Sequence, residues 1–228
     1  MRNLAHIGEA DYQIHGMCYN HLTMYLVTPR EVKYLPNILR ARKNLKLTLS
    51  SRQMQILIGS ILGDGYITYR GQIQLEHSDK YQPYLFWKFG ELKALAYGQP
   101  SLVERTDKRT GAKYRSYRFW LRQYFRPWRD YFYQKKIKIF PHGFELSPLA
   151  LAVWYMDDGC YSDGRCTIAT ECFSTESCQN IQDMLKKQFD LDTHIRSNGK
   201  LAIRARSQNS FFSIIRPYVH STMAYKIL

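Results

Sequence analysis

Two stretches of the chain, residues 53–64 and 147–158, are apolar on most faces, and each runs into an Asp-Gly pair. An apolar run of this length that a glycine terminates is typical of a buried helix. The pattern therefore predicts two buried helices that carry an aspartate in the last turn, Asp64 in the first helix and Asp158 in the second.

Three landmarks recur in both halves of the chain in the same order. They are an Asp-Gly pair, an Arg-Pro pair and a lysine: Asp64, Arg126 and Lys138 in the first half, and Asp158, Arg216 and Lys226 in the second. The lysine follows the aspartate by 74 residues in the first half and by 68 in the second. Such a recurrence predicts two structural repeats. The chain then divides into an N-terminal basic segment (1–51), a first repeat (52–138), a linker (139–146) and a second repeat (147–228).

The two repeats share a further pattern of helix-like and strand-like segments. Alternation of apolar and polar residues predicts strands within 65–77, 113–122, 165–171 and 193–206. Helical periodicity predicts further helices at 81–97, 123–134, 174–189 and 207–219. Each repeat is thus helix, two strands, helix, two strands, helix. The predicted fold class is α+β, with two pseudo-symmetric αββαββα repeats and antiparallel sheets.

The chain is strongly basic, with 33 Lys and Arg against 19 Asp and Glu and a formal net charge of +14. Between Arg105 and Lys138 there are twelve basic residues and two acids, interleaved with aromatic residues. This mixture is typical of nucleic-acid surfaces, because basic side chains that contact phosphates release condensed counterions. Double-stranded DNA is therefore the expected partner. The alternative is a basic protein that is merely soluble.

The composition disfavours several other classes of protein. No apolar run approaches the ~20 residues that span a membrane, so no membrane partner is expected. Five cysteines without a CxxC pair disfavour a disulfide framework and a zinc site. Because the N-terminus has no signal-peptide core, we expect an intracellular location. A mitochondrion, a chloroplast and a bacterial cytoplasm would all satisfy it.

The two helix-end aspartates are the most informative residues. A carboxylate in the last turn of a helix faces the negative end of the helix dipole, at a cost of ~0.3–1 kcal/mol. If the two helices pack side by side, Asp64 and Asp158 come together, and their like charges repel unless a cation lies between them. A hard divalent ion such as Mg²⁺ removes this repulsion. The alternative is that each aspartate only caps the turn before its glycine.

Two or more divalent ions held by carboxylates could catalyse phosphodiester hydrolysis. They would activate a water, neutralise the phosphoryl oxygens and assist the leaving group. Lys138 and Lys226, one per repeat, would then stabilise developing charge or orient solvent, which makes them candidate catalytic residues beside Asp64 and Asp158. The alternative for each lysine is a plain phosphate contact.

The segments LIGSILGDG at 57–65 and LAVWYMDDG at 151–159 resemble the paired motifs of the LAGLIDADG homing endonucleases, in the single-chain branch with two motifs. The resemblance covers about residues 53–228. It implies motif helices packed at the centre, two four-stranded saddle-shaped sheets in the DNA major groove, and a monomer with one active site per strand. It also implies that Asp64 and Asp158 bind the ions. Gly63 and Asp157, which precede them, are further candidate metal-site residues.

One feature departs from the family pattern. The first motif has Gly59 and Gly63 where close helix contact requires small residues, whereas the second has Val153 and Asp157 at the matching positions. These bulkier residues argue against equally close packing on the side of the second motif.

Candidate DNA-reading residues occur in the predicted sheets of both repeats. They are Gln72, Gln74, Glu76, Arg115 and Arg118 in the first repeat, and Arg196, Arg204 and Arg206 in the second. Alternation places Gln72, Gln74 and Glu76 on one face of the first sheet. In the major groove glutamine pairs well with adenine and arginine with guanine. The alternative for each side chain is a contact with phosphate or water.

Together these features predict a homing endonuclease that makes double-strand breaks in a long, asymmetric DNA site by metal-dependent hydrolysis. One alternative is an RNA maturase that assists group I intron splicing on the same fold, or a protein with both activities. Another is a DNA-binding regulator of the same fold. A glycosidase would also need two carboxylates, but the charge of +14 disfavours it.

Overall fold

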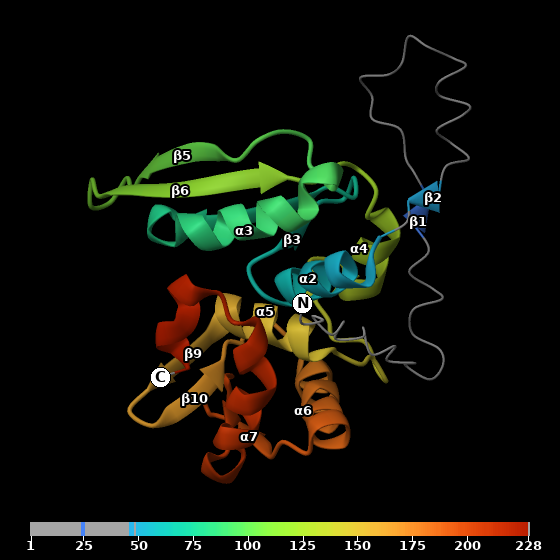
Figure 1. Ribbon diagram of the computed structural model, residues 1–228, viewed down its shortest axis with the longest axis vertical. Helices are drawn as coiled ribbons and strands as arrows, with labels where there is room; N and C mark the ends of the chain where they lie inside the picture. Colours follow the sequence, from blue (N-terminus) through green and yellow to red (C-terminus); the bar gives the residue numbers. More distant parts are fainter. Residues whose placement is uncertain (1–23, 26–45, 48, 228) are drawn as a thin grey trace, which may run out of the picture.

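The computed structural model describes residues 49–227 together with a short strand pair, β1 (Met24–Tyr25) and β2 (Lys46–Leu47). Most of the N-terminal basic segment therefore lies outside the described residues. Figure 1 shows two layered halves, in which helices and a sheet of the first repeat lie above those of the second. Among the described residues no helix is long and apolar enough to cross a membrane.

The elements of the first repeat follow the predicted order of helix, two strands, helix, two strands and helix, with two further short strands at the end. The elements are α2 (Ser51–Leu62), β3 (Tyr66–Ile67), β4 (Ile73–Ser78), η2 (Asp79–Tyr81), α3 (Gln82–Leu92), η3 (Lys93–Leu95), β5 (Ser101–Thr106), β6 (Lys113–Trp120), α4 (Arg126–Phe132), β7 (Tyr133–Gln134) and β8 (Ile137–Lys138). The strand β5 completes the second strand pair of this repeat.

The second repeat follows the same order. Its elements are α5 (Pro148–Asp158), β9 (Gly159–Ser162), β10 (Arg165–Ile168), α6 (Thr175–Phe189), β11 (Thr193–Ile195), β12 (Leu201–Ile203), α7 (Ala205–Ile215), η4 (Arg216–Tyr218) and η5 (Ser221–Lys226). The α+β prediction is therefore confirmed.

Local sequence signals start the two motif helices. Ser50 and Gln53 form a capping box at the start of α2, in which each side chain pairs with the other's backbone amide. In α5 the Ser147 side chain accepts a hydrogen bond from the Ala150 amide, and Pro148 occupies the first turn, where its missing N–H costs nothing.

Both four-stranded sheets are antiparallel and share one topology. The strand order is β3-β4-β6-β5 in the first repeat, and the matching order β9-β10-β12-β11 holds in the second. The strands differ in length, since β6 has eight residues and β12 has three. Helix α3 packs against β4 and β6 on one face of the first sheet, and on the other face Gln74 and Glu76 are only partly buried. The repeats are therefore similar but unequal.

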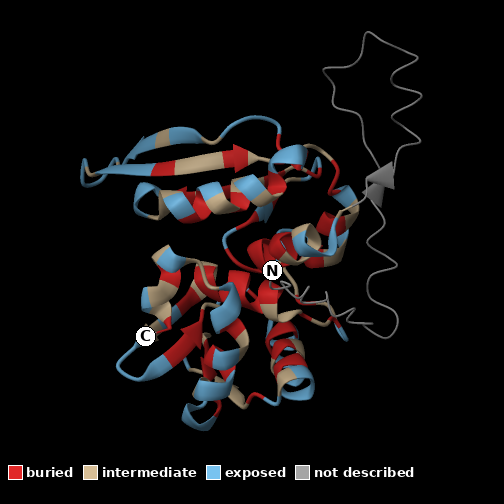
Figure 2. Ribbon diagram, viewed as in Figure 1, coloured by how far each residue is buried: buried red, intermediate tan, exposed pale blue. Residues whose placement is uncertain are grey.

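The motif helices α2 and α5 pack against each other at the centre of the molecule, where Figure 2 shows buried residues concentrated. A Cβ atom added to Gly59 would lie 2.7 Å from the Cβ of Val153, and one added to Gly63 would lie 2.5 Å from the Cβ of Asp157. Each bulky residue of the second motif thus faces a glycine of the first. One glycine per contact is enough for close packing, so Val153 and Asp157 do not push the helices apart.

The last predicted strand segment, 193–206, extends too far. Strand β12 ends at Ile203, and helix α7 begins at Ala205. The early helix start is stabilised because Ser207 accepts a hydrogen bond from the Asp192 amide at 2.9 Å and donates its own amide to the Arg204 carbonyl. The apolar and polar residues at 201–206 alternate as in a strand, but so short a pattern also fits the first turn of a helix.

Candidate active site

The two predicted catalytic aspartates lie at matching places in the two repeats. Asp158 is the last residue of α5, as predicted, whereas Asp64 follows Gly63, the C-cap of α2, and so lies just past its helix rather than in the last turn. Burial and the negative charges of Asp64 and Asp157 raise the pKa of Asp158 to about 7. Side-chain oxygens of Asp64 and Asp157, the neighbour of Asp158, lie within 4.8 Å of each other, so negative charge is concentrated where the two motif helices end.

Each predicted lysine bonds the backbone just before the aspartate of its own repeat. Lys138 Nζ donates to the Gly63 carbonyl, and Lys226 Nζ donates to the carbonyls of Met156 at 2.7 Å and Asp157 at 3.2 Å. Burial lowers the pKa of both lysines, although the nearby carboxylates oppose that shift. Each repeat therefore has the same arrangement: an aspartate, the backbone carbonyl that precedes it, and a lysine bonded to that carbonyl.

Asp157 differs from its two neighbours because its carboxylate is fully buried. Lys88 Nζ lies 2.8 Å from both of its oxygens, and the Tyr84 hydroxyl donates to Oδ1 at 2.8 Å. The Lys88 side chain is fully buried as well. The Asp157 carboxylate is thus paired with the Lys88 ammonium group inside the fold. The backbone carbonyl of Asp157 accepts a hydrogen bond from Lys226 instead.

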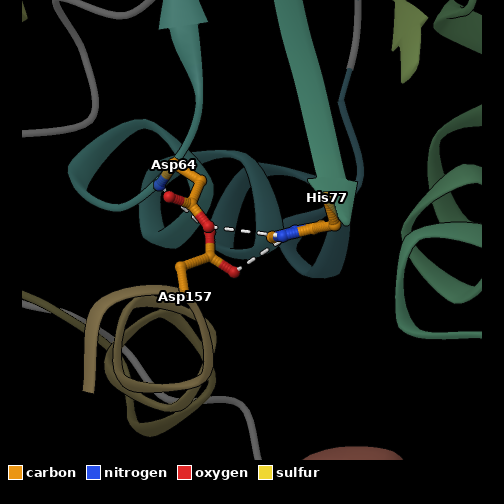
Figure 3. A group of neighbouring side chains, drawn as sticks. All are labelled: Asp64, His77 and Asp157. Atoms are coloured by element: carbon orange, nitrogen blue, oxygen red, sulfur yellow. Dashed lines mark hydrogen bonds and ion pairs between the residues drawn. The ribbon is translucent and has the colours of Figure 1, made fainter. Parts of the chain in front are cut away.

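His77 joins the two halves of the site. Its Nδ1 atom lies 3.3 Å from Asp64 Oδ2, and its Nε2 atom lies 3.6 Å from Asp157 Oδ1 (Figure 3). Burial opposes ionisation of Asp64, but the hydrogen bond from His77 and the charges of His77, Lys88 and Lys138 outweigh it and lower the pKa. Ligand atoms of the three residues in Figure 3 lie within 4.8 Å of one another, which a metal site requires.

Sequence reasoning missed His77, Lys88 and Tyr84. The signal for Lys88 was present, because a lysine stands in the middle of the otherwise apolar segment YLFWKF in the predicted helix 81–97. A buried ammonium needs an anionic partner, but the sequence did not indicate which acid provides it. His77 lies on the buried face of β4 with Ile73 and Leu75, and nothing in the local pattern separates it from an ordinary inward-facing strand residue.

The donor set of the centre is suited to a hard divalent cation. Asp64 and Asp158 would provide carboxylate oxygens, and Gly63 and Asp157 would provide the backbone carbonyls beside them. All of these are oxygen ligands, which Mg²⁺ and Ca²⁺ prefer. The raised pKa of Asp158 also marks a place where a bound cation would relieve repulsion between carboxylates.

Comparison with known proteins decides the family. Residues 54–212, more than half of the chain, match the LAGLIDADG DNA endonuclease family. The chain belongs to this family. This LAGLIDADG protein is 29% identical over 215 residues to the DNA endonuclease I-ChuI of Chlamydomonas applanata, with 79% of this chain and 96% of that protein covered. The predicted family and the predicted class of enzyme, a LAGLIDADG DNA endonuclease, are confirmed.

Two further comparisons relate the LAGLIDADG chain to a solved structure and to a maturase. The structure of the homing endonuclease I-WcaI bound to its DNA recognition sequence superposes with a TM-score of 0.72 at 25% identity, covering 87% of this chain and 96% of that one. The cytochrome b mRNA maturase bI2 of Saccharomyces cerevisiae is 26% identical over 222 residues. The alignment covers 86% of this chain but only 52% of the maturase.

The predicted DNA-reading residues of the first repeat do not all share one face. Gln74 and Glu76 alternate with the buried residues Ile73, Leu75 and His77 of β4, so they point away from the face on which α3 packs. Arg118 is paired directly with Glu76 across β4 and β6 and therefore lies on the same face. By the same alternation Arg115 lies on the other face, where its Nε atom is 3.4 Å from Glu104. Gln72 precedes β4, in the turn that joins it to β3.

In the second repeat the three predicted arginines separate into two groups. Arg196 and Arg204 line one hollow beside the sheet, together with Arg165. Arg206 lies in the first turn of α7, and its Nε atom is 2.7 Å from Asp192.

Proposed function

We propose that this LAGLIDADG endonuclease cuts both strands of a long, asymmetric double-stranded DNA site, and that Asp64 and Asp158 are its metal-binding catalytic residues. The observation that carries the proposal is the repeated arrangement of the centre. Each repeat supplies a helix-end aspartate, a preceding carbonyl and a lysine bonded to that carbonyl. One chain thus offers two similar sets of groups, as cleavage of two antiparallel strands requires.

Mg²⁺ is the ion that we propose for the centre, with two or more ions bound by Asp64, Asp158 and the carbonyls of Gly63 and Asp157. When bound, such ions supply an activated water and neutralise charge on the phosphate. The Nζ atoms of Lys138 and Lys226 lie at the edge of this centre. From there they can orient solvent or stabilise the charge that develops on the leaving oxygen. Their partly buried positions strengthen this electrostatic effect.

The proposed substrate follows from the unequal sheets and the charge. The first sheet has strands of up to eight residues and the second has strands of three or four, so the two halves of the site would be read over different lengths. The charge of +14 favours an extended polyanion inside the cell. The similarity to a DNA-bound homing endonuclease supports DNA as that polyanion.

A second candidate function is assistance to the splicing of a group I intron RNA. It is favoured by one observation, the similarity to the cytochrome b mRNA maturase bI2. Splicing assistance requires a basic surface but no metal-binding aspartates. The aspartate substitutions described next should therefore abolish DNA cleavage and leave any splicing assistance intact.

The proposal is tested by cleavage of duplexes selected from a randomised library in Mg²⁺. We expect Asp64→Asn and Asp158→Asn each to abolish double-strand cleavage while specific binding in a gel-shift assay is kept. Asp183→Asn is the matched control, because Asp183 is exposed on α6. Double-strand cleavage at the parent rate by either catalytic variant would contradict the two-site proposal.

A further inference from the structure

The carboxylate of Glu76 is saturated by hydrogen bonds from its own chain. Its donors are Gln74 Nε2 at 2.9 Å, Ser116 Oγ at 2.6 Å, Arg118 Nε at 2.7 Å, Arg105 Nη2 at 3.0 Å and Arg105 Nη1. A carboxylate has about four lone-pair sites. Five donors therefore leave Glu76 no free acceptor for a cytosine amino group, which is the base contact that a glutamate ordinarily makes.

The network is charge-assisted and fixed before any ligand binds. Burial alone would raise the pKa of Glu76, but the hydrogen bonds from Arg105, Ser116 and Arg118 outweigh it and lower the pKa to about 2. The carboxylate is thus ionised at every pH at which the protein would act. Its partners come from three strands, β4, β5 and β6, so the network also holds the sheet face together.

Arg118 is held in a defined orientation by this network. Glu76 binds its Nε atom, and its guanidinium carbon lies 5.9 Å from the centre of the Trp120 ring. Within the described part of the chain, Arg118 donates its hydrogen bonds through Nε alone, and the side chain is 23% exposed. The two terminal nitrogens are therefore directed by the network and remain able to donate to a ligand.

We infer that Glu76 is a positioning residue, which orients Arg118 to read a guanine in the half of the DNA site that lies on the first sheet. The inference rests on the proposed function, because it assumes that this face lies in the major groove. Guanine is the base that two parallel N–H donors recognise, through O6 and N7. An arginine oriented in the free protein loses less conformational freedom on binding than a mobile one.

The same sheet provides a matched control for the charge of Glu76. Glu104 and Arg115 form an exposed ion pair at 3.4 Å on β5 and β6, with side chains 69% and 53% exposed. Alternation places this pair on the face opposite Arg118. Glu104→Gln therefore makes the same change in net charge as Glu76→Gln but leaves the network around Arg118 intact.

The test is a base-preference profile measured by selection of cleaved duplexes from a randomised library. We expect the parent to require guanine at one position, and Arg118→Ala to lose that preference. Glu76→Gln should weaken the preference at the same position tenfold or more, and Glu104→Gln should leave it unchanged. Because Glu76→Gln removes a negative charge, its affinity for non-specific DNA should not fall, whereas a merely structural defect would weaken binding to every sequence.

Two results would overturn the inference. One is an unchanged guanine preference in Glu76→Gln, and the other is a lost cytosine preference at a position that Arg118→Ala does not affect. In both cases the parent still cuts a defined site, so the proposed function stands. A parent protein that selects and cuts no sequence would instead refute the proposed function, and the inference with it. Thermal unfolding of each variant shows that the compared proteins are folded.

Discussion

The three aspartates at the centre differ in burial and in the groups that surround them. Asp64 keeps a side chain 45% exposed and has a lowered pKa, since His77 and the lysines stabilise its charge. Asp157 is fully buried against Lys88. Asp158, beside both of the others, has a pKa raised to about 7. The same residue type thus provides a partly exposed carboxylate with a lowered pKa, a buried partner for Lys88, and a carboxylate whose pKa is raised to about 7.

The lysines are expected to act on the rate of cleavage rather than on affinity. Lys138→Met and Lys226→Met should slow cleavage of bound DNA by ~10-fold to ~1000-fold, the range for the loss of one charge-stabilising donor. Binding should change little, because catalysis requires interactions that are stronger in the transition state than in the ground state. Single-turnover cleavage with enzyme in excess measures this rate.

Lys136→Met is the control for the lysine variants, since Lys136 is exposed on the surface. If Lys138→Met and Lys226→Met cut bound DNA at the parent rate and only bind less tightly, both lysines are backbone contacts.

The Glu76 network predicts a pH dependence of stability. The pKa of Glu76 is about 2 in the fold and 4.5 as its ordinary value. The network therefore contributes its full stabilisation above about pH 4.5, and this is lost as the pH falls toward 2. The shift corresponds to at most about 3 kcal/mol, and solvent around the half-exposed Arg105 reduces the effect to about 1–2 kcal/mol.

Urea unfolding between about pH 5 and pH 3 measures this dependence. The free energy of unfolding should fall more steeply with acid in the parent than in Glu76→Gln, because glutamine has no proton to bind. Parallel curves for the two proteins would show that Glu76 has no lowered pKa in the fold.

At the scale of elements, the contact between α2 and α5 combines close packing with a buried ion pair. The glycines of α2 admit Val153 and Asp157 of α5, and Lys88 of α3 reaches Asp157 from the side. Burial of an isolated charge is expensive, whereas a paired and hydrogen-bonded charge is tolerated. Three helices from both repeats are thus joined at one carboxylate.

Removal of Lys88 alone should therefore destabilise the protein strongly. We expect Lys88→Met to lower the free energy of unfolding by about 3–5 kcal/mol, because it leaves the Asp157 carboxylate buried and unpaired. The double variant Lys88→Met/Asp157→Ala should recover most of this loss, since it removes both charges and keeps a Cβ atom against Gly63. Urea unfolding checks both values, and a double variant no more stable than Lys88→Met would contradict the buried-pair explanation.

At the scale of the whole molecule, two unequal repeats enclose one centre. The acids and lysines of both repeats lie around the contact of α2 with α5. The repeats are also linked at their edge, where the hydroxyls of Tyr81 and Tyr225 lie 2.8 Å apart. Each proposed set of catalytic groups is thus supplied by this one chain.

We therefore predict that one protein molecule binds and cuts one duplex. Sedimentation of the inactive Asp64→Asn/Asp158→Asn double variant with its selected duplex should give a complex of one protein per DNA. The cleavage rate of the parent, with DNA limiting, should rise linearly with protein concentration below saturation. A required complex of two proteins, or a second-order rise, would contradict a monomeric enzyme.

The amino-acid sequence by itself determined the repeat, the motif helices, and the places of the two aspartates and two lysines. These features are local or periodic: an apolar run ended by Asp-Gly predicts a buried helix, and a lysine at a similar distance after each motif predicts an equivalent place in each repeat. The alternation around Gln74 likewise predicts that Gln74 and Glu76 point away from the core and that Ile73 and Leu75 point into it.

Only the tertiary structure decided which charges meet. Lys88 pairs with Asp157 across 69 positions, and Arg105 pairs with Glu76 across 29. No period or local propensity relates such residues, because their contact depends on helix packing, on strand register and on side-chain direction. Alternation along β6 already puts Arg115 and Arg118, which are three residues apart, on opposite faces, but only the strand register shows that Arg118 is the one that lies beside Glu76. The roles of Glu76, Lys88 and His77 therefore follow from the assembled fold.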